Sequence, residues 1–293
     1  MTMQPTAQQL DIFADSRDVV LRNGVLDQLQ RRDGAAARAA LEELAAEYPD
    51  DRALSAMTVL VRELEGGSTT PFADHAVLAV ARRHLEDEVA PAVRQVLPAQ
   101  TGYAWLAPCW SSLAQRAAGL AFRGVQADSH AGNHAAPLWL LAGEWMAACD
   151  AVERIESWWR IPAPLMWMTE ARYRTEGLDA AWPLLAELAW LAPGCFAALL
   201  TRLGDASLDA LRRRFDAEFP GTGGADDYAW FPALRAREKQ WTSPGALKIL
   251  GSAVCEVSIR SAEKVDSTTV GVSIFRSKFR MVGSPIKPGV QPC

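Results

Sequence analysis

The chain has 293 residues, is 49% hydrophobic and 22% charged, and carries a formal net charge of −5. This composition is close to that of an ordinary globular protein with a sizeable core. An acidic surface repels phosphate backbones, so we expect no nucleic-acid partner. No run approaches the ~18 apolar residues of a membrane span, so we expect no membrane partner. The opening residues lack the basic and apolar regions of a secretory signal, and we expect a cytoplasmic protein.

The five cysteines are spread along the chain, and their number is odd. None forms the C-x-x-C pair of a zinc site or the dense pattern of a disulfide framework. We therefore expect buried free thiols and no metal cofactor, as is usual in a reducing cytoplasm. The positions are Cys109, Cys149, Cys195, Cys255 and Cys293.

The first clear helical pattern lies between residues 33 and 49. Large or apolar residues recur there at spacings of four, three and four, at Ala37, Leu41, Leu44 and Tyr48, which places them on one face of a helix. Charged residues occupy the other side. An Asp-Gly pair precedes the pattern and a proline follows it, so both ends of the helix are marked.

Two further helical patterns follow. Residues 72–97 predict either one long helix or two helices broken near Pro91, and residues 105–125 predict another. Segments rich in turn-forming residues separate the helices. The predicted breaks are residues 65–71, 127–137 and 220–227, the last of which is interpreted as a linker.

The second break holds a candidate metal site. His130 and His134 have the i, i+4 spacing with which two imidazoles on a helix can share one metal, and Asp128 is near. The glycine and asparagine between the histidines favour a loop. In a loop, residues four apart do not lie on one face, so the spacing no longer indicates a shared metal. We favour a polar loop in which Ser129 or Asn133 caps the next helix. A helical metalloprotein or enzyme that uses Asp128, His130 and His134 is the alternative.

Tryptophan is the one enriched residue type, with nine of its eleven copies between Trp105 and Trp190. The densest point is the pair Trp158 and Trp159. Neighbouring side chains on a helix point about 100° apart, so both cannot be buried against the same neighbour. The pair is either an aromatic patch that binds a peptide or packing at a helix end, and we favour packing.

Residues 177–194 predict another helix. With Asp179 as its N-cap, Pro183 falls in the first turn, where its missing N–H has no partner to lose. Trp182 then lies on the main apolar stripe and is expected in the core, whereas Trp190 lies off that stripe. For Trp190 we favour packing between repeats, and an exposed contact with a partner is the alternative.

The helix at 177–194 repeats the design of the helix at 33–49. In both, a small residue is followed by two leucines and then, five residues later, by a proline. A third, weaker copy begins after Gly143, which precedes Gly177 by 34 residues. The matched triplets are Ala37, Leu41 and Leu44; Ala181, Leu185 and Leu188; and Ala148, Val152 and Ile155.

Helix pairs with this pattern and period resemble tetratricopeptide (TPR) repeats, whose second helix carries a small residue, a large one and a closing proline. The resemblance implies an all-α fold, a TPR-like helical-repeat array or α-solenoid, over residues 8–240. It also implies protein–protein interaction, because such arrays present long concave surfaces to peptides or partner domains.

The expected function is that of a non-enzymatic scaffold or adaptor whose partner is an unknown protein or peptide. No phosphate-binding loop, dinucleotide fingerprint or nucleophile elbow occurs, which favours a non-enzymatic function without a cofactor. The candidate partner-binding residues are Trp158, Trp159 and Trp190.

Residues 246–293 form a tail of different composition. They carry seven basic and three acidic side chains, a net charge of +4, which leaves −9 for the rest of the chain. Lysine is absent before Lys239, and the arginine-only, alanine-rich body suggests a high-GC bacterial gene. Apolar and polar residues alternate in the tail, as in strands. The tail is either a β-hairpin or a fusion or altered reading frame without regular structure, and we favour the second interpretation.

Overall fold

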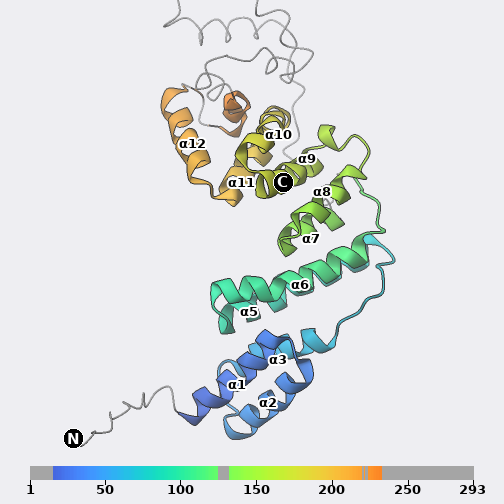
Figure 1. The fold of residues 1–293 in the computed structure, drawn as a ribbon, viewed down its shortest axis with the longest axis vertical. Helices are drawn as coiled ribbons and strands as arrows, with labels where there is room; N and C mark the ends of the chain where they lie inside the picture. The colour runs from blue at the N-terminus through green and yellow to red at the C-terminus, as the bar shows by residue number, and fades with distance from the viewer. Residues whose placement is uncertain (1–15, 125–131, 220, 222–223, 233–293) are drawn as a thin grey trace, which may run out of the picture. The chain divides into compact units, whose positions relative to one another are not determined.

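The computed structural model describes residues 16–124, 132–219, 221 and 224–232, and within these ranges every regular segment is helical. The all-α expectation is therefore confirmed for the described residues. The helices belong to two compact units, Met1–Thr175 and Glu176–Cys293. The first unit contains α1 (Arg17–Arg31), α2 (Gly34–Glu47), α3 (Leu54–Glu65), α4 (His75–His84), the π-helical turn η1 (Leu85–Val89), α5 (Ala90–Val96), α6 (Ala99–Ala117), α7 (Ala135–Ala142), α8 (Trp145–Glu153), the 3-10 turn η2 (Trp158–Arg160) and α9 (Pro162–Glu176). The second contains α10 (Leu178–Leu191), α11 (Pro193–Leu203), α12 (Ala206–Glu218) and the 3-10 turn η3 (Ala225–Trp230) (Figure 1).

Helices of the first unit pack on their neighbours in the chain: α1 on α2, α2 on α3, α6 on α7, and α7 on α8 (Figure 1). The buried face of α2 consists of the predicted residues Ala37, Leu41 and Leu44. The N–H of Ala36 donates to the Asp33 carboxylate at 2.9 Å, which caps the helix where the Asp-Gly pair was expected to start it. The predicted face is confirmed for these three residues, whereas Tyr48 is the C-cap of α2 and is only partly buried.

Residues 75–96 form one continuous helical stretch with an irregular turn in the middle. Within η1 the N–H of Ala90 donates to the carbonyl of Leu85, five residues earlier, so the turn is wider than an α-turn. Pro91 follows directly. A proline ring collides with the carbonyl four residues before it in a regular helix, and a wider turn relieves that collision. The helix therefore passes Pro91 without breaking.

The other two copies of the repeated triplet also lie on buried faces. Ala148, Val152 and Ile155 are buried at α8, and Ala181, Leu185 and Leu188 are buried on α10 while Glu187 is exposed. The residues of all three triplets are thus buried as predicted, whereas the helix predicted at 105–125 is α6, which runs from Ala99 to Ala117.

The predicted start of α10 is wrong. Gly177, with φ of 84°, is the N-cap, and Asp179 lies inside the first turn. Glycine adopts a positive φ at little steric cost. A carboxylate in the first turn stabilises the helix, because its negative charge lies near the positive end of the helix dipole. Pro183 consequently lies beyond the first turn, inside the helix, where its ring removes a hydrogen bond to the Asp179 carbonyl.

The second unit has a closed aromatic core. The ring centroid of Phe231 lies 5.1 Å from that of Phe196 in α11 and 5.7 Å from that of Phe215 in α12. The ring of Tyr228 in η3 lies 5.7 Å from that of Phe215. Trp182, which was expected in the core, is partly buried with its ring 6.2 Å from Phe231. The segment 220–227 was interpreted as a linker, but its end forms η3, which packs on α10 and α11.

Cys109 and Cys149 are buried thiols, whereas Cys195 is disulfide-bonded, against the expectation of free thiols. The tail 246–293 lies outside the described residues, so both interpretations of it stay predictions, as does the cytoplasmic location. Among the helices that the structure describes, none has the length and apolar character needed to cross a membrane.

Candidate functional site

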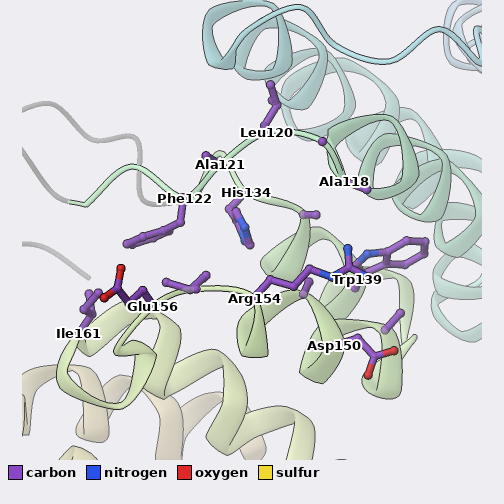
Figure 2. Close-up of a pocket in the computed structure, with 15 residues that line it drawn as sticks. Ala118, Leu120, Ala121, Phe122, His134, Trp139, Asp150, Arg154, Glu156 and Ile161 are labelled. Carbon is purple, nitrogen blue, oxygen red and sulfur yellow. The ribbon is translucent and has the colours of Figure 1, made fainter.

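A cavity of about 560 Å³ lies in the first unit (Figure 2). It is enclosed by residues 118–122, which follow α6, by the start of α7, and by α8 with the residues that lead from it to Ile161. Its walls are mainly apolar and consist of Leu120, Phe122, Trp139, Ile155, Ile161 and five alanines. Its polar side chains are His134, Asp150, Arg154 and Glu156.

His134 is the N-cap of α7, and its imidazole is held in place on three sides. The N–H of Ala136 donates to His134 Nδ1 at 3.2 Å. The ring stacks on Trp167 with a centroid distance of 5.7 Å, and Phe122 meets it edge-on at 5.8 Å. Ser129 or Asn133 was expected to help cap this helix. Ser129 lies outside the described residues, and the N-cap is His134, which itself supplies the accepting atom.

The cap determines which nitrogen of His134 carries the proton. Since Nδ1 accepts a hydrogen bond, a neutral ring has its proton on Nε2. Among the described residues none accepts a hydrogen bond from Nε2. The ring points into the space between Phe122 and Arg154 (Figure 2). His134 therefore offers one N–H donor to whatever occupies the cavity.

The charge state of His134 is set by its surroundings. The residue is 7% exposed, and burial together with repulsion from a charge on His75 lowers the pKa of His134 to about 4. His75 is itself buried, and its Nε2 donates to the Ala121 carbonyl at 2.9 Å. His134 is therefore neutral around pH 7, and Nε2 acts as an uncharged donor.

Three charged side chains line the cavity from α8 and the residues after it. Asp150, Arg154 and Glu156 are all exposed to solvent, which places them at its mouth. No described residue forms an ion pair with any of them, although Asp150 and Arg154 are four residues apart on one helix face. Arg154 instead extends toward Trp139 (Figure 2). Its guanidinium is thus available to an anion.

The two adjacent tryptophans lie beside this cavity. They form η2, which connects the cavity-lining residues Ile155 and Glu156 to Ile161. Their rings meet edge-on at 5.9 Å, and Trp159 is 49% exposed while Trp158 is partly buried. The pair lies in a 3-10 turn rather than at the end of an α-helix. Its role in partner binding stays a prediction.

Trp190, the third candidate residue, belongs to the second unit. It lies on α10, is 51% exposed, and meets Trp230 of η3 edge-on at 6.4 Å. Its neighbour Leu191 is also exposed. Packing explains one side of the indole and leaves the other open to solvent.

The proposed metal site receives no support from the described residues. Asp128 and His130 lie outside them, and the Nδ1 atom of His134 is occupied by the helix cap. Within the described part of the chain no three histidine, cysteine or carboxylate side chains are grouped as metal ligands would be.

The cavity was not predicted, because Phe122, His134 and Trp167 come from separate segments and no spacing pattern connects them.

Comparisons with known proteins give no family for the chain. No protein-family model matches it, and no match was found among curated proteins or solved structures.

Proposed function

We propose that the chain is a non-enzymatic interaction protein, a TPR-like helical-repeat scaffold or adaptor, and that the turn Trp158–Arg160 contacts its partner. The repeated triplet, buried at all three copies, supports a repeat architecture. The observation that carries the proposal is the exposed indole of Trp159, fixed edge-on against Trp158.

An exposed tryptophan with a fixed ring suits protein recognition. Tryptophan and arginine are enriched among the residues that dominate binding energies, and both occur in this turn as Trp159 and Arg160. A ring held by its neighbour loses little conformational freedom on binding. The partner proposed is a peptide or protein segment with an apolar residue that covers the free face of Trp159.

The test compares Trp159 with Trp190, a matched control in the other unit. The two indoles are 49% and 51% exposed, and each meets one other tryptophan edge-on. Peptides selected from a displayed random library on the full chain are labelled and titrated by fluorescence anisotropy. We expect Trp159→Ala to weaken binding by about tenfold or more, and Trp190→Ala to leave it unchanged.

The result can contradict the proposal in two ways. If the selected peptides bind Trp159→Ala as tightly as the wild type, the turn is not the contact surface. If Trp190→Ala causes the larger loss, the partner surface belongs to the second unit.

A further inference from the structure

The cavity beside this turn has the features of a small-molecule site. Its volume of about 560 Å³ lies within the range of ligand pockets. Phe122, Trp139 and two isoleucines provide apolar and aromatic walls. Such walls suit a flat apolar group, since aromatic rings pack edge-on or offset against one another.

Two donors without partners among the described residues face the same cavity. Arg154 presents a planar guanidinium, which binds a carboxylate through two parallel hydrogen bonds. His134 presents Nε2–H, and the cap on α7 together with the Trp167 ring keeps it oriented. Because the low pKa of His134 keeps this ring neutral, the formal positive charge comes from Arg154 alone.

Two carboxylates limit how much negative charge the cavity accepts. Asp150 and Glu156 line it together with Arg154, and no described residue pairs with either. The three side chains sum to one negative charge, so a ligand with one carboxylate gains the arginine contact, whereas a second negative charge would be repelled. A monoanion is therefore favoured over a dianion.

We propose that this cavity binds a small aromatic monocarboxylic acid, with the carboxylate on Arg154, an oxygen accepting from His134 Nε2–H, and the ring against Phe122 and Trp139. The ligand is a free organic acid, and its site is separate from the partner surface at Trp159.

Isothermal titration of the full chain tests the charge requirement. The probes are phenylacetate, indole-3-acetate, the neutral phenylacetamide and the dianion phenylmalonate. Both monocarboxylates are expected to bind at least about tenfold more tightly than phenylacetamide, the size of effect typical of charge-assisted hydrogen bonds, and phenylmalonate more weakly than phenylacetate. Equal binding of the acid and the amide, or no binding of either acid at millimolar concentration, would overturn the proposal.

Three variants assign the contacts. Arg154→Gln is expected to weaken phenylacetate binding about tenfold or more. Arg160→Gln, which removes an exposed arginine of the same connection that does not line the cavity, should leave it unchanged. His134→Asn keeps a capping side chain but removes the Nε2–H donor that reaches into the cavity, and should weaken binding without loss of helical circular dichroism. An equal loss in both arginine variants would contradict the site.

Binding of the acid is independent of the proposed partner surface. Trp159→Ala should bind phenylacetate like the wild type even where it no longer binds selected peptides. Peptide binding without acid binding would refute this site alone, and acid binding without peptide binding would refute the partner surface alone.

Discussion

The two units use their aromatic side chains differently. In the second unit Phe196, Phe215 and Phe231 are buried and close a core on one another. In the first unit Phe122 and Trp167 pack around the polar ring of His134, at the wall of a cavity. A closed apolar cluster contributes to stability, whereas a cluster that holds an oriented donor beside a cavity has a group available to a ligand.

The two tryptophan pairs, each with one exposed ring, show the same contrast. Trp190 and Trp230 are far apart in the chain, so their contact connects α10 to η3. Trp158 and Trp159 are adjacent, so their contact connects no separate elements. Both pairs meet edge-on, and Trp159 and Trp190 are exposed to nearly the same extent. Only the contact between Trp190 and Trp230 has a clear structural role. Exposure of a tryptophan is thus weaker support for binding when its contact joins distant segments.

The largest expected effect concerns the core of the second unit. Leu185 is 1% exposed on α10, and Leu185→Ala is expected to lower the free energy of unfolding by ~2–5 kcal/mol because it leaves a cavity. Glu187→Ala, on the exposed side of the same helix, should change it by less than ~0.5 kcal/mol. Denaturant unfolding followed by circular dichroism measures both.

A loss below ~1 kcal/mol for Leu185→Ala would be too small for a buried leucine. It would show that the second unit is not a closed core and would remove the contrast between the units.

The next effect concerns the pH dependence of the first unit. The pKa of His134 is lowered from 6.5 to about 4, by burial first and then by His75, so the unfolded chain binds a proton that the folded chain does not. The contribution of neutral His134 to stability is therefore complete above pH 6.5 and decreases as the pH falls toward 4. At pH 5 about 2 kcal/mol is lost.

The matched variant is His134→Asn, which keeps a capping side chain but cannot titrate. Unfolding free energies at pH 7.5 and pH 5 should decrease more for the wild type than for this variant. Equal decreases would mean that His134 titrates at its ordinary pKa and is not enclosed by Phe122 and Trp167.

What could be predicted from the sequence is local. The buried faces of α2 and α10 follow from helical spacing alone, and Ala37, Leu41, Ala181 and Leu185 are buried as expected. The start of α10 was missed because Asp179 was taken as the N-cap. The N-cap is Gly177, which adopts a positive φ. Local patterns identify a helix face well but place its first residue less accurately.

The cavity could not be predicted, because its parts meet only through tertiary packing. Phe122 follows α6, His134 precedes α7, and Trp167 lies in α9. Histidine is not a usual N-cap residue, so the sequence favoured Ser129 or Asn133 as the cap. The pair Trp158–Trp159 was visible as a composition feature, but its position beside the cavity depends on the turn between α8 and α9.

The smallest effect compares the two tryptophan pairs directly. Trp190→Ala is expected to lower the free energy of unfolding by ~1–2 kcal/mol, since it removes an edge-on ring contact and the buried half of the indole. Trp159→Ala is expected to lower it by less than ~0.5 kcal/mol, because adjacent side chains keep much of their contact in the unfolded chain. Urea unfolding followed by circular dichroism compares the two without relying on tryptophan fluorescence. If Trp159→Ala is the more destabilising change, η2 has a packing role, and the exposure of Trp159 would no longer distinguish a binding residue from a structural one.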